Sequence, residues 1–414
     1  MGISERCATR WRDSYRGILS GRLTPAGGRA EADAGTAGSQ CRHRRAPQWY
    51  YAFFAQDPEF QLYFKVKAEI EPSADATPEN IACYAGLIRS VADAHGIEMD
   101  GGAVTTLLGM ASRWAEHRAR LSSRFELVAD VLIEASKLSP GAAITAEHVR
   151  GAVETRRQRN GQVEKRVQRA IEDGVILIET RGEEVGQING LTVQHLGDHA
   201  FGSPARITAR ASVGRRGVIN IERLVAMSGP IQQKGSMVLQ GILMRRFAHD
   251  FPLSFDCSVT FEQMYGGVEG DSASMAEFIA IISELAEVPI RQDLAITGSI
   301  NQLGDAQVIG GVHHKVEGFH SACVSTGGLT GTQGVVLPAA NAINLVVRDE
   351  VRDSVAEGRF HLYTVNRVEE AIELFTGRVV GEQAADGSYP ADSVYGRVMA
   401  TLSRFDRMLS ERGI

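Results

Sequence analysis

Lysine is scarce in this chain. Only six of its 44 basic residues are lysines: Lys65, Lys67, Lys137, Lys165, Lys234 and Lys315. Chemistry that needs an amine therefore has few candidate positions. Cysteine is equally sparse, with five scattered residues and no CxxC pair. This pattern argues against a disulfide framework or a cysteine-ligated zinc site, and it favours a reducing cytoplasm.

Long apolar runs are also missing. No stretch approaches the roughly 20 residues that a membrane-spanning helix requires, and the N-terminus lacks the apolar core of a secretory signal. The net charge of −6 gives no electrostatic argument for binding nucleic acid or an anionic membrane. We expect a cytoplasmic protein with no nucleic-acid or membrane partner.

The chain of 414 residues has room for two or three domains. Residues 1–47 contain nine Arg, no Lys and no helix or strand period, so we expect an unstructured or aberrant arm. Residues 48–172 are predicted to form a helical domain with a connecting helix, and residues 173–380 an α+β domain. Residues 381–414 are predicted to be a polar tail that ends in a helix.

The helical part carries clear start signals. Thr77-Pro78 opens one helix, a second surrounds Val104, a third follows Ser122, and Thr145 opens a fourth. The charged stretch 155–174 is expected to be a solvated helix. From Val175 the period changes to two, so the runs 175–180, 191–196, 205–213 and 217–222 are predicted strands. Helices are expected around 233–249, 272–287 and 367–376.

The segment EGDSAS, residues 269–274, is the first candidate for chemistry. Its glycine permits a tight turn, and Ser272 then falls at the start of a helix, where free backbone N–H groups point outward. Such donors suit the oxyanion that forms when a serine attacks a carbonyl group. A serine at this position also commonly serves as the N-cap of the helix.

The segment GGVHHKVEGF, residues 310–319, is the second candidate. Lys315 is expected one turn into a helix opened by the Gly-Gly pair, with Val312, Val316 and Phe319 at helical spacing around it. Desolvation can lower the pKa of a lysine toward roughly 7–8, where it can accept a proton from serine. A surface lysine without chemistry is the alternative.

Residues 175–380, including EGDSAS and VPIRQDLAITGSINQLGDAQVIGGVHHKVEGF, closely resemble the proteolytic domain of the Lon protease family, in its LonB-like and LonC-like branches. The resemblance implies a serine endopeptidase with Ser272 as nucleophile and Lys315 as general base. It further implies that Thr297 orients the lysine, and that Asp271 and Glu269 flank the nucleophile in supporting positions.

Residues 75–155 resemble the small helical lid of the Lon AAA+ ATPase module. Arg124 falls where such lids place an arginine that senses nucleotide, although a surface arginine is an equal alternative. The chain contains no GxxxxGK[ST] phosphate loop, so we do not expect it to hydrolyse ATP as it stands. ATP-Mg would matter only with an ATPase core upstream, and peptide hydrolysis itself needs no cofactor.

The histidines indicate no metal site from the sequence alone. His195 and His199 have the i,i+4 spacing but lack the glutamate of HExxH, so zinc is not expected there. His313 and His314 are interpreted as packing or groove residues rather than ligands.

The resemblance implies a homo-hexameric ring that acts on unfolded or damaged proteins. Two alternatives remain: a non-catalytic assembly or regulatory module with the same fold, and an inactive fragment.

Overall fold

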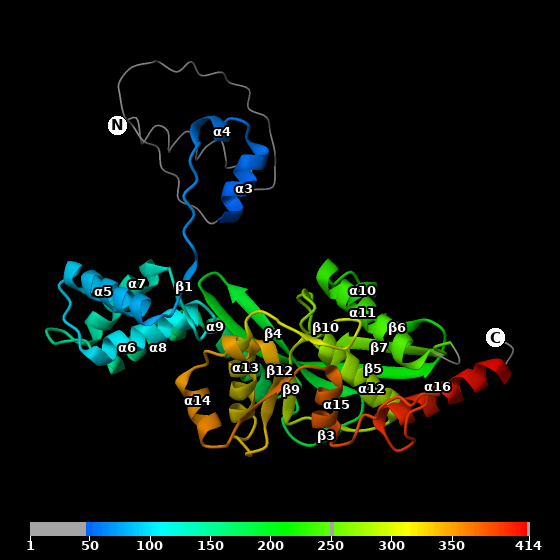
Figure 1. The fold of residues 1–414 in the computed structure, drawn as a ribbon. Coiled ribbons are helices and arrows are strands. Elements are labelled where there is room, and N and C mark those ends of the chain that lie inside the picture. Colours follow the sequence, from blue (N-terminus) through cyan, green and yellow to red (C-terminus); the bar gives the residue numbers. More distant parts are fainter. Residues whose placement is uncertain (1–46, 249–251, 412–414) are drawn as a thin grey trace. The chain divides into compact units, whose positions relative to one another are not determined.

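The computed structural model describes residues 47–248 and 252–411 (Figure 1). The predicted arm, residues 1–47, lies outside this range except for Pro47. Two short helices, α3 (Pro47–Gln56) and α4 (Phe60–Tyr63), belong to a first compact unit that ends at Ile70. Residues 71–414 form the second unit. This unit contains both the segment that resembles the AAA+ lid and the segment that resembles the proteolytic domain.

The second unit begins with a helical region in which the predicted helices are present. Thr77 caps the first of them by accepting a hydrogen bond from the Asn80 backbone N–H at 3.3 Å, with Pro78 as the first helical residue. The predicted charged helix is broken in two at Gly161, which ends one helix and precedes the next. The elements are β1 (Ser73–Asp75), α5 (Pro78–Ala94), α6 (Gly101–Trp114), β2 (Arg120–Ser122), α7 (Phe125–Leu138), α8 (Ala146–Asn160) and α9 (Gln162–Glu172).

The remainder of the second unit mixes helices and strands, as predicted. Its strands are β3 (Glu183–Glu184), β4 (Gln187–Leu196), β5 (His199–Val213), β6 (Gly217–Asn220), β7 (Phe255–Phe261), β8 (Ile290–Arg291), β9 (Leu294–Ile296), β10 (Ser299–Ile300), β11 (Ala306–Gln307), β12 (Gly334–Pro338) and β13 (His361–Val365). Its helices are α10 (Ile221–Leu224), α11 (Pro230–Phe247), α12 (Ser274–Ala286), α13 (Val312–Ser325), the 3-10 helix η1 (Ala339–Asn344), α14 (Asp349–Ala356), α15 (Val368–Thr376) and α16 (Val394–Glu411). None of the described helices is long and apolar enough to cross a membrane.

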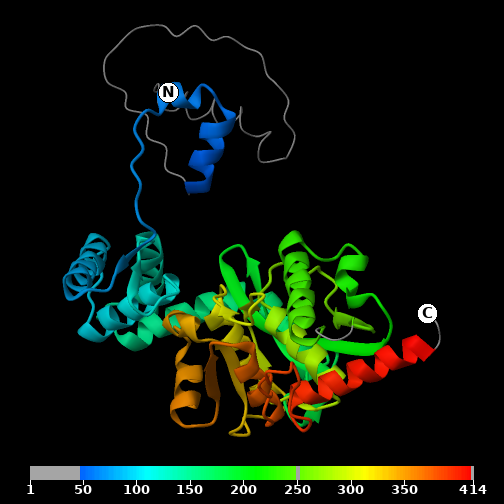
Figure 2. The same ribbon diagram turned by 45° about the vertical axis from the view of Figure 1, so that its right-hand side comes forward.

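A seven-stranded mixed sheet organises this part, in the order β13-β12-β9-β4-β5-β7-β6. The first four strands of that order run parallel to one another, β5 is antiparallel to both of its neighbours, and β6 is parallel to β7. Figures 1 and 2 show the helices on either side of this sheet.

The strands bury side chains on both faces, and successive residues serve different cores. In β9, Leu294 and Ile296 join the core formed with α11, α12 and α16, whereas Ala295 between them joins the core formed with α13 and α14. In β12, Val336 joins the first of these cores and Val335 joins the second. The helix α12, which begins two residues after Ser272, and the helix α13, which carries Lys315, therefore lie on opposite faces of the sheet.

The predicted strand at residues 175–180 is wrong. Its alternation arises because Ile176 and Ile178 pack beside α9 and α13 in a small separate cluster. Its backbone bonds to a side chain instead of a neighbouring strand: the Leu177 N–H donates to Gln263 Oε1 at 2.8 Å, and Gln263 Nε2 donates to the Val175 carbonyl at 2.8 Å. The segment is an extended linker between the helical region and the sheet.

Candidate active site

The structure brings Ser272, Lys315 and Thr297 together. Lys315 Nζ lies 2.8 Å from Ser272 Oγ and 3.0 Å from Thr297 Oγ1. Thr297 directly follows β9, an inner strand of the sheet. The three side chains come from three separate elements, so only the folded sheet unites them.

Ser272 lies just before α12 rather than capping it. The helix begins at Ser274, its N-cap residue is Ala273, and no side chain caps it. Gly270 has φ +93°, which turns the chain sharply ahead of the serine. The Ser272 carbonyl accepts hydrogen bonds from the Gly298 N–H at 2.8 Å and from the Thr297 hydroxyl at 3.2 Å. The serine Oγ is thereby left to face the lysine.

Unpaired backbone donors lie beside that hydroxyl. In the described part of the chain, the N–H groups of Ser272 and Ala273 have no hydrogen-bond partner. They sit at the positive end of α12, where the helix dipole favours negative charge. The local geometry therefore offers what a developing oxyanion requires.

Lys315 is held by close contact between α13 and β5. A Cβ atom added at Gly318 would lie 2.2 Å from the Gly202 carbonyl oxygen, and one added at Gly202 would lie 2.7 Å from Lys315 Cα. Only glycine at both positions lets the two backbones approach this closely. Gly311, with φ +64°, ends the preceding turn and starts the helix.

The lysine is buried, with 3% of its surface exposed. Burial lowers its pKa from 10.5 to about 8, an effect that the negative charge of Asp271 partly opposes. Among the described residues, Lys315 has no ion pair with a carboxylate. Such a lysine loses its proton far more readily than one in water.

The two acidic residues that flank the serine have different positions. Asp271 accepts a hydrogen bond from Ser299 Oγ at 3.0 Å, and Ser299 also donates toward Gln307 Oε1 at 3.2 Å. Glu269 instead accepts from the Ile231 N–H at 3.3 Å, at the N-terminus of α11. Asp271 thus acts on the charge of Lys315, while Glu269 helps to cap a neighbouring helix. No motif in the sequence indicates the contribution of Ser299.

The other predicted positions lie apart from this cluster. Arg124 is the N-cap residue of α7, with its side chain mostly exposed and paired with Glu126 at 3.1 Å. His199 Nε2 lies 2.9 Å from Glu164 on α9, so this imidazole is engaged in packing the helical region against β5.

A groove of about 890 Å³ contains Ser272 and Lys315 in its lining. All six residues from Leu191 to Leu196 of β4 line it, together with Ser272 and Lys315. The strand β9 pairs with β4 only at Asn189 and Gly190, so beyond this point the described residues place no strand on that edge of β4. A stretch of free strand edge therefore runs into the site.

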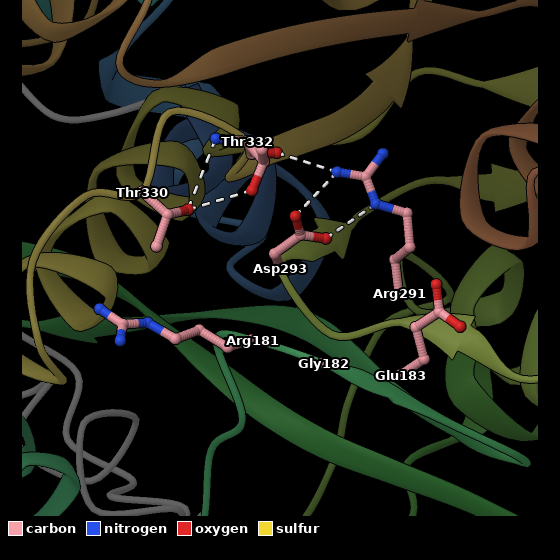
Figure 3. Close-up of a pocket in the computed structure, with 7 residues that line it drawn as sticks. All are labelled: Arg181, Gly182, Glu183, Arg291, Asp293, Thr330 and Thr332. Carbon is pink, nitrogen blue, oxygen red and sulfur yellow. Dashed lines mark hydrogen bonds and ion pairs between the residues drawn. The ribbon is translucent and has the colours of Figure 1, made fainter.

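A second pocket, shown in Figure 3, lies elsewhere and includes neither Ser272 nor Lys315. Arg291 and Asp293 form a two-contact ion pair in it, at 2.9 and 2.8 Å, and Arg291 also donates to the Thr332 carbonyl. Its charges are compensated from within, which makes the groove at Ser272 and Lys315 the stronger candidate for a functional site.

Two family models match the chain. Residues 178–376 match the Lon protease (S16) C-terminal proteolytic domain, and residues 98–159 match the AAA+ ATPase lid domain of archaeal LonB.

Three relatives illustrate the similarity. The chain is 41% identical over 248 residues to a putative Lon protease homolog of Escherichia coli (strain K12), an alignment covering 59% of this chain and 42% of the relative. It is 34% identical over 343 residues to a putative Lon protease homolog of Haemophilus influenzae, covering 82% of this chain and 55% of the relative. It is 31% identical over 198 residues to the archaeal Lon protease of Pyrococcus abyssi, covering 48% of this chain and 18% of the relative.

The chain thus spans about half the length of the two bacterial relatives. Both matched domains occur in the order lid, then proteolytic domain, and both relatives carry the same family name. The chain belongs to the Lon protease family.

Proposed function

We propose that this chain is a serine endopeptidase that cleaves unfolded or damaged proteins with Ser272 as nucleophile and Lys315 as general base. The observation that carries the proposal is the 2.8 Å contact between Lys315 Nζ and Ser272 Oγ, made by a buried lysine without a carboxylate partner. Serine–lysine pairs are a recognised variant of the catalytic triad.

Thr297 sets the direction of the proton transfer. Its hydroxyl donates to the Ser272 carbonyl, so its oxygen is free to accept a hydrogen bond from Lys315 Nζ. A neutral amine that donates one N–H to Thr297 can turn its lone pair toward the Ser272 hydroxyl. Thr297 is therefore a positioning residue in this mechanism.

The reaction proceeds in two halves. Lys315 takes the proton of Ser272 Oγ as this oxygen bonds to the substrate carbonyl carbon, and the N–H groups of Ser272 and Ala273 stabilise the resulting oxyanion. The intermediate collapses when Lys315 returns the proton to the leaving amine, which breaks the peptide bond and leaves an ester on Ser272. A water molecule, deprotonated by Lys315, then attacks the ester. The bond between the acyl carbon and Ser272 Oγ breaks, Lys315 returns the proton to this oxygen, and the acid is released.

The groove supports an extended peptide as substrate. The free edge of β4 at residues 191–196 offers backbone donors and acceptors that an added strand can pair with. This mode requires an unfolded segment, because a folded chain cannot present a free strand to a recessed edge. Pairing with β4 recognises the substrate backbone more than its side chains. Such recognition suits an enzyme that degrades many different sequences.

We further propose a homo-hexameric assembly, in keeping with the family. The exposed apolar side chains on α10, α11 and the turn between them support a protein contact at this surface. They are Leu224, Val225, Ile231, Met237 and Met244, each at least 48% exposed. Light scattering on the purified chain tests this, with a hexamer expected and a monomer contradicting it.

Degradation of a denatured, fluorescently labelled protein tests the activity, with and without ATP-Mg. We expect cleavage that does not need ATP, because the 414 residues contain no phosphate-binding loop. Ser272→Ala and Lys315→Gln should each abolish this cleavage. A folded chain that cleaves nothing would overturn the proposal and favour a non-catalytic module. Cleavage that survives both substitutions would assign the activity to other residues.

A further inference from the structure

The helical region is joined to the proteolytic domain through the turn that follows α6. Arg118 N–H donates to the Ile343 carbonyl at 2.8 Å, and Asn344 Nδ2 donates to the Glu116 carbonyl at 2.9 Å. Glu116 itself adopts φ +51°, a left-handed conformation that few residues other than glycine accept. These contacts fix the backbone of Glu116 against the proteolytic domain.

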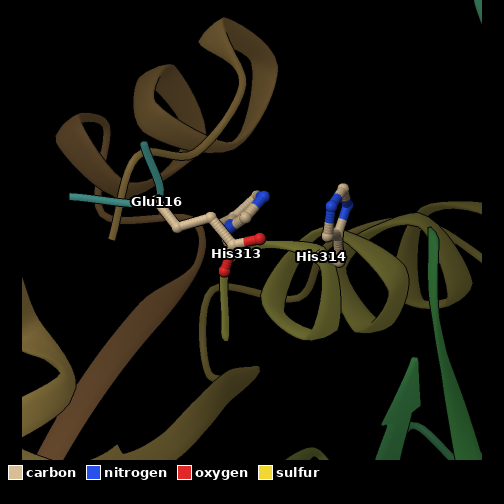
Figure 4. Close-up of side chains that lie close together, drawn as sticks. All are labelled: Glu116, His313 and His314. Carbon is tan, nitrogen blue, oxygen red and sulfur yellow. The ribbon is translucent and has the colours of Figure 1, made fainter. Parts of the chain in front are cut away.

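The Glu116 side chain reaches from this turn toward two histidines at the start of α13, as Figure 4 shows. One ligand atom from each of Glu116, His313 and His314 lies within 4.8 Å of the others. The two imidazole rings are 4.0 Å apart between centroids. Residues separated by about two hundred positions thus converge on one point.

His313 has a buried polar atom that the protein leaves unsatisfied. Its side chain is 2% exposed, and its Nδ1 has no hydrogen-bond partner within the described residues. A buried polar group without a partner costs free energy, on the order of 1–3 kcal/mol, so an unpaired imidazole nitrogen beside a carboxylate and a second imidazole points to a ligand.

We propose that Glu116, His313 and His314 bind a divalent transition-metal ion, with Zn²⁺ as the best fit. Two imidazoles and one carboxylate form a donor set that zinc prefers over magnesium or calcium, both of which take oxygen ligands. Ligands of a tetrahedral zinc ion lie about 3.3 Å apart, so side-chain rotations within the cluster would close the distances from at most 4.8 Å to this value.

The electrostatic surroundings permit this binding. Burial lowers the pKa of His313 to about 3 and that of His314 to about 4, so both rings are neutral at pH 7 with lone pairs available. Arg113 and Arg348 also lie near the rings, but both guanidinium groups pair with the buried carboxylate of Glu317. The single negative charge of Glu317 thereby offsets part of their repulsion toward a cation.

The site would fasten the two parts of the second unit to each other. Glu116 belongs to the helical region and the histidines belong to the proteolytic domain, so the metal ion would bridge them. Glu116 also lines the groove that contains Ser272 and Lys315. With three protein ligands, the fourth position remains open to water or to a group from a bound peptide.

Zinc affinity of the full chain tests the proposal. After dialysis against EDTA, the protein competes with a chromogenic chelator for Zn²⁺, and Co²⁺ provides an independent absorption spectrum. We expect one tightly bound ion per chain. Glu116→Gln, which keeps the side-chain shape, and His314→Gln should each weaken binding at least tenfold and remove the Co²⁺ bands.

The control is His95→Gln, which removes an exposed histidine at the end of α5 and should change neither readout. Circular dichroism checks that each variant folds, and Glu116→Gln changes a partly exposed position that should tolerate it. Binding of equal strength in all variants would assign the zinc to other histidines and overturn the proposal, as would an absence of binding at micromolar Zn²⁺.

Discussion

Lys315 and Glu317 lie two positions apart on α13 and are equally buried, each with 3% of its surface exposed. Glu317 pairs with Arg113 through two contacts and with Arg348 at 3.1 Å, and these charges hold its pKa at about 2. Lys315 has hydroxyl partners only, and its pKa falls to about 8. Burial is common to both residues, and the presence of a counter-ion decides whether the pKa shifts to favour the charged form or the neutral form.

The comparison separates a structural charge from a reactive one. Glu317 connects the helical region to α13, and the ion pairs with Arg113 and Arg348 stabilise its charged form. Lys315 is destabilised in its charged form and so is ready to act as a base. The two residues should therefore respond in opposite ways to substitution.

The largest expected effect is on activity. Lys315→Met and Lys315→Arg should both reduce peptide cleavage by roughly 10³-fold or more, because neither side chain can accept a proton near pH 8. Lys137→Met, at an exposed position in the helical region, is the matched control and should leave the rate unchanged. Retained activity in Lys315→Arg would show that the positive charge, rather than the base, is what the site needs.

Glu317→Gln should cost about 3–5 kcal/mol of stability, because it leaves Arg113 and Arg348 without their buried counter-charge. Urea unfolding at pH 7 measures this loss. The control is Glu126→Gln, which breaks the exposed Arg124–Glu126 ion pair and should change the stability little. A loss of similar size in both variants would remove the distinction drawn for Glu317.

Lys315→Met should change the free energy of unfolding in the opposite direction to Glu317→Gln. It should stabilise the fold at pH 7 by on the order of 3 kcal/mol. The lysine pKa is about 8 in the folded chain against 10.5 in the unfolded one. Below pH 8 the full cost of burying the charge is present, and it falls as the pH rises toward 10.5. Urea unfolding of both proteins at pH 7 and pH 10 should show the difference shrinking, and a destabilised variant at pH 7 would contradict this account.

Thr297→Val removes one hydroxyl and keeps the shape of the side chain. It should reduce the cleavage rate by about 10- to 100-fold, in line with about 1.5–3 kcal/mol for a hydrogen bond to a charged group. Thr297→Ser should restore most of the rate, because it restores the hydroxyl. An unchanged KM with a reduced kcat would support a positioning role.

The smallest effect should be a shift in pH dependence. The wild-type cleavage rate should rise with pH and level off above about 8, where Lys315 is neutral. Asp271 raises the lysine pKa, so Asp271→Asn should move this rise to lower pH. Assays with EDTA present exclude any contribution of bound metal, and a shift to higher pH would contradict the assigned role of Asp271.

Local patterns predicted the helical region well, because caps such as Thr77 act within one turn of the helix that they begin. They also made Ser272 and Lys315 candidates, although the roles of nucleophile and base came from the family resemblance and stay a prediction. They failed at residues 175–180, where alternate packing imitates a strand but the hydrogen-bond partner is the Gln263 side chain. Local alternation cannot reveal whether a second strand exists.

The partners that tune the site were beyond prediction for the same reason. Arg113 meets Glu317 across 204 positions, and Glu116 meets His313 through a turn of unusual backbone conformation. Nothing near either histidine in the sequence signals a carboxylate. The Gly202–Gly318 contact likewise becomes meaningful only when α13 lies on β5.

The central claim is that neutral Lys315 activates Ser272. The most direct test is labelling of the purified chain by a serine-reactive fluorophosphonate, followed over pH by mass spectrometry, because it needs neither a protein substrate nor ATP. We expect the label on Ser272, at a rate that rises through pH 8 and is lost in Lys315→Met. Labelling of Ser272 that is equally fast in Lys315→Met, or a label on another serine, would contradict the account.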